Sequence, residues 1–227
     1  MHVPNVALLL SPSASSYGPR IDHLYYIVLW ITGAVFILTE SALILFSVRY
    51  RRQEGKKAFY THGSIKAEVI WTLIPTVILV SLAFMSQSLW SELRYPTHFP
   101  PGAVTIRVLA EQWVWHFTYP GPDGVFGTVD DITVDNDFHV PLGQTVRLEA
   151  ASQDVIHGFY LPALRVHQDV VPGMTTPLWV MATQKGSYDL RCTQFCGTNH
   201  YQMKGQMIVE DPADFQTWLS GVKASSF

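Results

Sequence analysis

Apolar residues are concentrated in the first 92 positions, where two long runs carry almost no charge. One covers residues 24–48 and the other covers residues 69–90. At a rise of about 1.5 Å per residue, each run is long enough to cross a hydrocarbon layer of about 30 Å. We therefore predict a two-helix transmembrane hairpin over residues 23–92. Glu40 is the one charge inside the first run, and we expect it to face a protein neighbour because charge is costly in lipid.

The loop between the two runs, residues 49–66, carries six basic residues and one acid. Loops on the cytoplasmic side of membrane proteins are enriched in Lys and Arg, so we expect this loop in the cytoplasm. An N-terminal segment, residues 1–22, and all residues after Ser91 would then be extracytoplasmic. The pattern predicts a two-pass integral membrane protein, and we expect it in a bacterial cytoplasmic membrane.

A different pattern begins after the second apolar run. Residues 93–103 are rich in proline and indicate a linker, and residues 104–227 then contain short runs of Val, Ile, Thr and aromatic residues separated by turn signals. Such runs predict strands, and many strands without helices between them favour a β-sandwich or barrel. The expected strands are 104–110, 113–119, 144–151, 177–183, 187–191 and 206–210. Asp211 and Pro212 then indicate the start of a short C-terminal helix.

Charge is distributed unevenly along the chain. The formal net charge is −3, but the part from Arg94 to Phe227 has eight basic against thirteen acidic residues, a net charge of −5. An acidic soluble region does not favour nucleic acid as a partner. A basic partner protein fits this composition better.

The segment from Cys192 to Met203 carries the most specific chemistry. It holds both cysteines of the chain together with His200 and Met203, in the spacing Cys-x3-Cys-x3-His-x2-Met. Sulfur ligands beside an imidazole favour copper over metals that prefer oxygen, and a thioether argues against zinc. We infer a copper electron-transfer centre. The alternative is a disulfide between Cys192 and Cys196, which would leave His200 and Met203 unexplained.

From residue 24 to residue 218, the chain resembles subunit II of the haem-copper cytochrome c oxidases, which carries the dinuclear copper centre CuA. The resemblance rests on the cysteine motif, on the hairpin before a β domain and on four further segments. These are Asp154-Val-Ile-His157, Glu68-Val-Ile-Trp-Thr-Leu-Ile-Pro75, Gln112-Trp-Val-Trp115 and Gln168-Asp-Val-Val-Pro-Gly173. It implies an all-β cupredoxin-like Greek-key domain. It also implies a subunit that accepts electrons from cytochrome c and passes them to the haem of subunit I, where oxygen is reduced and protons are pumped.

The resemblance also implies roles for individual residues. Cys192 and Cys196 would bridge two copper ions. His157 and Met203 would complete one copper site, while His200 and the backbone carbonyl of Gln194 would complete the other. Trp113 matches the aromatic residue through which electrons arrive, and Glu68 matches a carboxylate at the mouth of a proton-uptake route. A group of carboxylates would attract a basic cytochrome c: Asp123, Asp130, Asp131, Asp135, Asp137 and Asp154. Subunits I and III are the implied membrane partners.

The sequence also departs from the family pattern. Many members have a glutamate between the cysteines that binds magnesium at the subunit I boundary, and Gln194 stands there in this chain. Magnesium therefore lacks its carboxylate. Met174 replaces an arginine that many members carry after the Pro-Gly turn. Residues 122–131 form an insertion whose acids do not match a regular calcium loop.

Three alternative functions fit the sequence less well. A quinol oxidase subunit would have lost the copper ligands, and all of them are present here. A nitric oxide reductase-type complex can reuse the motif, but the helical hairpin with Glu68-Val-Ile-Trp disfavours it. A copper chaperone would need an open site, whereas this motif supplies a full set of ligands. The sequence does not identify the donor cytochrome, the haem types of subunit I or the role of Glu40.

Overall fold

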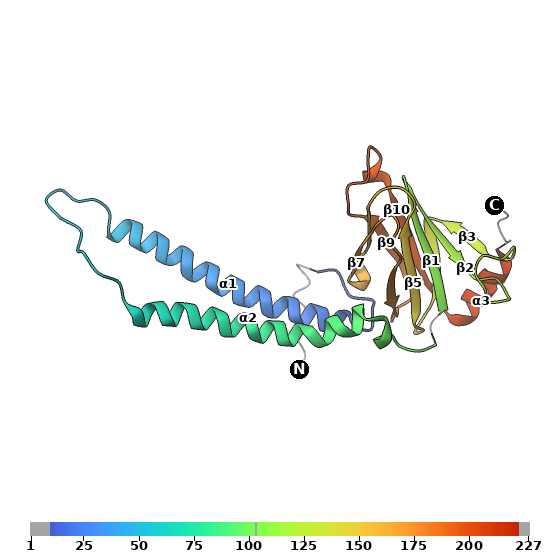
Figure 1. The fold of residues 1–227 in the computed structure, drawn as a ribbon, viewed down its shortest axis with the longest axis horizontal. Helices are drawn as coiled ribbons and strands as arrows, with labels where there is room; N and C mark the ends of the chain where they lie inside the picture. Colours follow the sequence, from blue (N-terminus) through green and yellow to red (C-terminus); the bar gives the residue numbers. More distant parts are fainter. Residues whose placement is uncertain (1–9, 103, 223–227) are drawn as a thin grey trace. The chain divides into compact units, whose positions relative to one another are not determined.

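The computed structural model describes residues 10–102 and 104–222, and they form two compact units. One unit consists of residues 20–90 and is helical. The other combines the segment that ends at Pro19 with the residues from Ser91 onward, and it is a β domain with two sheets (Figure 1).

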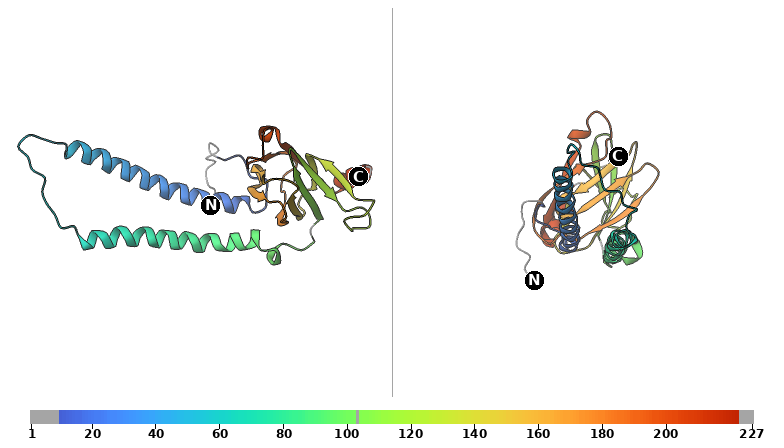
Figure 2. Two further views of the ribbon diagram at one scale, coloured as in Figure 1. Left: turned by 45° about the horizontal axis from the view of Figure 1, so that its top comes forward. Right: turned by 90° about the vertical axis from the view of Figure 1, so that its left-hand side faces the viewer.

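Two long helices make up the helical unit. The helices α1 (Gly18–Arg49) and α2 (Ile65–Arg94) extend beyond the apolar runs at both ends, and each is long and apolar enough to cross a membrane. The loop of residues 50–64 joins them, as both views of Figure 2 show. Glu40 is exposed on α1. Within the described part of the chain, Gly18 is the only buried residue of the two helices, so their apolar faces must be covered from outside the chain.

In the residues that the structure describes, the β domain contains ten strands in two five-stranded sheets. The strands of the first sheet, in spatial order, are β3 (Ile132–Asp135), β2 (Val114–Tyr119), β1 (Val104–Glu111), β5 (Val146–Ser152) and β8 (Thr176–Val180). Those of the second are β4 (Asp137–Pro141), β10 (Lys204–Glu210), β9 (Gly186–Cys192), β6 (His157–Leu161) and β7 (Val166–Val170). The pairs β1–β5 and β4–β10 are parallel, and the other pairs are antiparallel. Short 3-10 turns lie at Pro96–His98, Pro162–Leu164 and His200–Gln202.

Alternating side chains of the two sheets form the core between them. On β2, Trp115, Phe117 and Tyr119 are fully buried on one face, as the period of two in a strand requires. Phe117 stacks on Phe138 of the opposite sheet with ring centroids 4.1 Å apart. The expected all-β sandwich after a helical hairpin is therefore confirmed. Strands β3, β4, β6 and β7 were not expected from the sequence.

Segments from both ends of the chain pack against the β domain. Ser15 forms an antiparallel bridge with Ala182, next to backbone hydrogen bonds from Ala14 N to Ala163 O and from Thr183 N to Ala14 O, both of 2.8 Å. This places the segment before α1 beside the end of β8. The C-terminal helix α3 (Pro212–Gly221) buries Phe215 in the core.

Candidate metal centre

Three neighbouring strands of the second sheet bring the sulfur and imidazole groups together. His157 is the first residue of β6, Cys192 is the last residue of β9, and Met203 directly precedes β10. Because β6 pairs with β9 in the register Phe159 opposite Cys192, the start of β6 lies beside the chain that leaves β9. The loop of residues 193–202 therefore begins and ends on paired strands, which hold it at both ends.

The close approach of β6 to this loop depends on Gly158. The Thr193 backbone N donates to Gly158 O at 3.1 Å. A Cβ atom on residue 158 would lie 2.4 Å from Thr193 Oγ1 and 2.8 Å from the backbone N of Gln194. Any larger residue would push the ligand loop away from His157, so glycine is required at this point.

The donor atoms converge on one small volume. His157 Nδ1 lies 3.1 Å from Met203 Sδ and 4.0 Å from Cys192 Sγ. The two sulfurs of Cys192 and Cys196 are 3.6 Å apart, and Met203 Sδ is 3.8 Å from Cys196 Sγ. Among the described residues, His157, Cys192 and Cys196 are the group of His, Cys and carboxylate side chains close enough to share a metal ion. His157 is fully buried.

The remaining two expected ligands lie at the edge of this cluster. The backbone O of Gln194 is 3.3 Å from Cys192 Sγ, and His200 Nδ1 is 3.5 Å from Cys196 Sγ. The Gln194 carbonyl therefore contacts Cys192, and the His200 ring contacts Cys196. The structure thus brings the other four expected donor groups next to the two cysteine sulfurs.

Both cysteines are free thiols. Their separation of 3.6 Å far exceeds the disulfide bond length of about 2.05 Å. It is short enough for both sulfurs to bind one ion at a typical metal–sulfur distance of about 2.3 Å. The donor set, two thiols with imidazole and thioether groups in a largely buried site, fits copper in chemical type.

The two thiols differ in their affinity for protons. Burial raises the pKa of Cys192, but hydrogen bonds with His157, the Gly158 backbone and Cys196 outweigh burial and lower it to about 6. Burial and the neighbouring Cys192 thiolate raise the pKa of Cys196 to about 12. Without a metal, the pair therefore holds one proton and one negative charge. Binding of a metal to both sulfurs releases that proton.

Asp154 orients the buried imidazole. Its Oδ1 lies 2.9 Å from His157 Nε2, and its Oδ2 accepts the backbone N–H of Gln112 at 2.8 Å. Burial lowers the pKa of His157, but hydrogen bonds with Cys192 and Asp154 reverse this and raise it overall. A carboxylate on one ring nitrogen leaves Nδ1 directed at the sulfurs, an arrangement common among metal-binding histidines.

Trp113 lies at the tight turn between β1 and β2, which belong to the opposite sheet. Its indole N–H donates to the backbone O of Cys196 at 3.2 Å. Trp115 faces the core instead, with its ring centroid 6.1 Å from that of His157. The expected strand 113–119 included both Trp113 and Trp115. Because β2 begins at Val114, Trp113 belongs to the turn.

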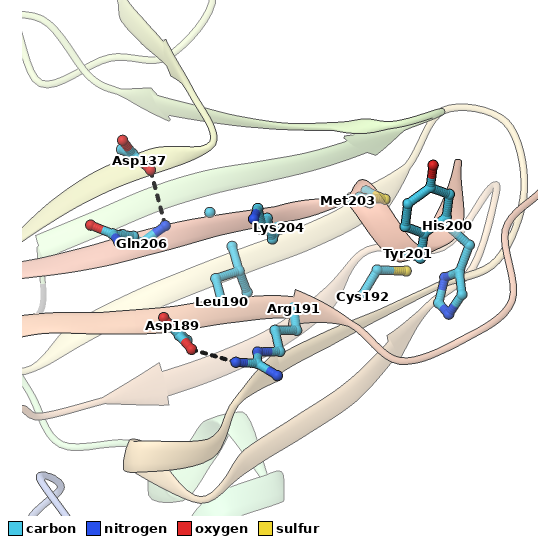
Figure 3. Close-up of a pocket in the computed structure, with 11 residues that line it drawn as sticks. Asp137, Asp189, Leu190, Arg191, Cys192, His200, Tyr201, Met203, Lys204 and Gln206 are labelled. Carbon is cyan, nitrogen blue, oxygen red and sulfur yellow. Dashed lines mark hydrogen bonds and ion pairs between the residues drawn. The ribbon is translucent and has the colours of Figure 1, made fainter. Parts of the chain in front are cut away.

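A surface pocket of about 630 Å³ opens beside the cluster, along β9 and β10. Cys192, His200 and Met203 gather at one end of it, whereas Asp189 and Arg191 form an ion pair farther along the strands (Figure 3). Neither Cys196 nor His157 lines this pocket. Exposed aromatic side chains flank the ligands on the loop, namely Phe195 and Tyr201.

The acidic residues fall into two groups. Asp154 contacts His157, whereas Asp137 lines the pocket at the end away from Cys192, where it accepts the backbone N–H of Gln206 (Figure 3). In the insertion, Asp123, Asp130 and Asp131 accept hydrogen bonds from the loop's own backbone or hydroxyl groups, while Asp135 lies 2.7 Å from His116. Glu68 lies in the first turn of α2, in the helical unit.

Comparisons with known proteins agree with this arrangement. Residues 104–210 match the family model described as the periplasmic domain of cytochrome c oxidase subunit II, and residues 4–89 match the transmembrane domain of the same family. The chain is 34% identical to the alternative cytochrome c oxidase subunit 2 of Bradyrhizobium diazoefficiens, over 94% of this chain and 83% of that protein. It is 28% identical to cytochrome c oxidase subunit 2 of Thermostichus vulcanus, over 92% of this chain and 77% of that protein.

Two solved structures are also similar. The periplasmic domain of subunit II of cytochrome oxidase (CoxB) of Bradyrhizobium japonicum matches with 28% identity and a TM-score of 0.47, over 54% of this chain and 95% of that one. A chain of a heme-copper terminal oxidase dimer matches with 21% identity and a TM-score of 0.43, over 63% of this chain and 99% of that one.

Proposed function

The chain belongs to the cytochrome c oxidase subunit II family, and from this premise we propose that its β domain holds the dinuclear copper centre CuA. As subunit II of a haem-copper cytochrome c oxidase, it is an integral membrane protein with subunit I as a partner. Oxygen reduction takes place in that partner, and electron acceptance through CuA is the function of this family.

The proposed ligands divide into a shared pair and two flanking sets. Cys192 and Cys196 provide the shared sulfurs, which lie 3.6 Å apart. His157 and Met203 complete one side, with donor atoms 3.1 Å apart, while His200 and the Gln194 carbonyl complete the other. When bound, two thiolate-bridged copper ions would share one unpaired electron, so that oxidation and reduction change bond lengths little.

The chain's own residues limit movement at this site. Asp154 fixes the His157 ring, and the paired strands β9 and β10 fix both ends of the ligand loop. Burial of His157, Cys196 and Met203 excludes water from most of the donor set. A rigid, mostly dry site favours electron transfer because few groups must rearrange.

We propose that electrons arrive through Trp113. The hydrogen bond from its indole to Cys196 O connects a partly exposed aromatic ring directly to the backbone of a ligand. The proposed donor is a cytochrome c or a cytochrome c domain, which the carboxylate of Asp154, in contact with His157, would attract if its surface is basic. Exposed Phe195 and Tyr201 add apolar contact area around the centre.

We place the β domain on the extracytoplasmic side. The segment before α1 forms an isolated bridge between Ser15 and Ala182, just after β8, and the residues up to Pro19 and from Ser91 onward belong to one compact unit with the β domain. The loop of residues 50–64 lies at the other end and holds four of the six basic residues, which favours the cytoplasm. In this arrangement residues 1–22 are an outer segment, 23–92 the membrane hairpin, 93–103 a linker and 104–227 the CuA domain.

Glu68 is the proposed carboxylate at the mouth of a proton route into subunit I. It is exposed in the first turn of α2, at the end that we place in the cytoplasm. Thr72 and Thr76 follow it at intervals of four and line the same shallow surface pocket, so polar groups continue along one helix face. Subunit III is proposed as a further membrane partner on family grounds.

Gln194 does not supply the carboxylate that magnesium would need at the subunit I boundary. Its amide leaves only neutral oxygen donors at this position, and Mg²⁺ sites usually include one or two carboxylates. The insertion of residues 122–131 uses its aspartates in its own hydrogen bonds, and we assign it no ion.

Electron paramagnetic resonance of the full chain, reconstituted with copper in detergent, tests the proposal. We expect two copper ions per chain and a seven-line hyperfine pattern shared by two nuclei, and we expect the variant C196S to lose that pattern. One copper per chain, or an unchanged spectrum in C196S, would contradict the ligand assignment. A quinol oxidase-type subunit would bind no copper, and a nitric oxide reductase-type complex would reduce nitric oxide in the assembled enzyme.

A further inference from the structure

The turn between β1 and β2 consists of two residues, Gln112 and Trp113, because Glu111 pairs with Val114. This turn belongs to the first sheet, whereas the proposed ligands lie on or beside strands of the second sheet. It therefore reaches the metal centre from across the sandwich. Of the two turn residues, Trp113 has the proposed role in electron entry, and Gln112 has no role in that proposal.

Gln112 contacts both of the segments that carry the ligands. Its backbone N–H donates to Asp154 Oδ2 at 2.8 Å, and Asp154 in turn holds the His157 ring at 2.9 Å. Its side-chain Nε2 donates to the backbone O of Cys196, also at 2.8 Å. One residue therefore connects the segment that carries His157 with the loop that carries Cys196.

The ligand loop and the Gln112–Trp113 turn leave no space between them for a side chain on residue 197. Gly197 follows Cys196 and has a φ angle of +117°, which L-residues with a side chain rarely adopt. A Cβ atom on residue 197 would lie 2.8 Å from Gln112 Nε2 and 3.1 Å from Trp113 Cζ2. The turn and the loop are thus packed directly against each other, with glycine required at the contact.

We propose that Gln112 is a positioning residue that holds the His157 segment and the Cys196 loop at a fixed separation. The inference rests on the proposed copper function, because the two segments supply ligands from both sides of the sulfur pair. Partners that orient ligands from outside the ligand set typically contribute a factor of about 10–100 to metal affinity. Gln112 acts on two ligand segments at once, so its loss is expected to affect retention of the metal and its spectrum together.

The variant Q112A keeps the backbone bond to Asp154 and removes only the amide donor to Cys196. Q153A is its matched control. Gln153 is also an exposed glutamine next to Asp154, but the hydrogen bond to the Cys196 carbonyl comes from Gln112 and not from Gln153. With copper-loaded full chains in detergent, we expect Q112A to lose copper to a chelator about 10-fold faster or more. We also expect a shifted midpoint potential and an altered hyperfine pattern. Identical values for Q112A and Q153A would overturn the proposal.

A second measurement does not depend on copper. In the metal-free full chain carrying C192S, Cys196 is the only thiol, so its rate of reaction with a disulfide reagent reports how firmly its loop is held. We expect Q112A to react several-fold faster than Q153A in this background. Equal rates for Q112A and Q153A would refute the positioning role, even if CuA forms. Failure of the wild-type chain to bind two copper ions would instead refute the proposed function, and the thiol result would still be valid.

The variant G197A disturbs the same contact from the other side. We expect it to reproduce the faster thiol reaction, and we expect the double variant Q112A/G197A to differ little from G197A alone, because both changes break one contact. Fully additive effects would show that the two residues act independently and would contradict the proposed contact. Circular dichroism of each variant confirms that the β domain is folded before rates are compared.

Discussion

Replacement of Gly158 by alanine tests whether close strand packing holds the metal site together. The added Cβ would lie 2.4 Å from Thr193 Oγ1, 2.8 Å from the backbone N of Gln194 and 3.1 Å from the carbonyl carbon of Thr193. The hydroxyl can rotate away, although it would then lose its 2.9 Å contact with His167. The two backbone atoms cannot move unless the ligand loop shifts away from β6.

The size of the effect follows from this overlap. Forcing one extra methyl group into a packed contact costs about 1–3 kcal/mol. For a domain of this size, each kcal/mol lowers Tm by several degrees, so we expect a fall of roughly 5–15 °C. The same shift moves the loop that carries Cys196 and His200 away from His157, so copper retention should also fall.

The matched control is G221A at the end of α3, where a new Cβ meets no atom within 4 Å. Thermal unfolding of the metal-free full chains and copper loss to a chelator would be compared for the two variants. If G158A unfolds at the same temperature and keeps copper as well as G221A does, the packing of β6 against the ligand loop does not constrain the site, and the reasoning is wrong.

Three further predictions concern the donor surface and the core. W113L should keep two copper ions but slow cytochrome c oxidation in the assembled oxidase, because truncating an aromatic interface residue often weakens binding by about 2 kcal/mol or more; an unchanged rate would exclude Trp113 as the point of electron entry. Raising the ionic strength from low to physiological should slow oxidation of a basic cytochrome c but not of a small uncharged donor, since charges are screened over about 8–10 Å; a flat response would remove the role of the carboxylates. F117A should destabilise the β domain by about 3–5 kcal/mol in denaturant unfolding, since Phe117 is fully buried against Phe138; a loss below 1 kcal/mol would contradict this packing.

The sequence predicted the elements whose side-chain pattern is strong. The membrane helices follow from two long apolar runs, and β1 and β2 follow from alternating apolar residues over six to eight positions. Strands β3, β4, β6 and β7 have only four or five residues each. Such short segments contain too few alternations to stand out, and pairing with neighbouring strands, which the sequence does not reveal, gives them their structure.

The same limit applies to the site. The cysteine motif could be found because its residues lie close together in the sequence, and His157 could be found only through a family motif. The contact between Gln112 and Cys196 joins residues 84 positions apart, and no spacing rule connects them. Gly158 and Gly197 carry no chemistry of their own, so only the packed structure shows why a side chain would not fit there.

These contacts imply that the metal centre depends on the packing of the whole sandwich. The second sheet supplies His157, Cys192 and the loop that follows, whereas the first sheet supplies the Gln112–Trp113 turn that contacts that loop. Trp115 of the first sheet also packs on Phe159, which follows His157 on β6, with ring centroids 5.4 Å apart. A change that shifts one sheet relative to the other would therefore move the turn and its hydrogen bonds away from the ligands. Because hydrogen bonds weaken steeply with misalignment, core substitutions far from the sulfurs should alter the copper spectrum before they unfold the domain.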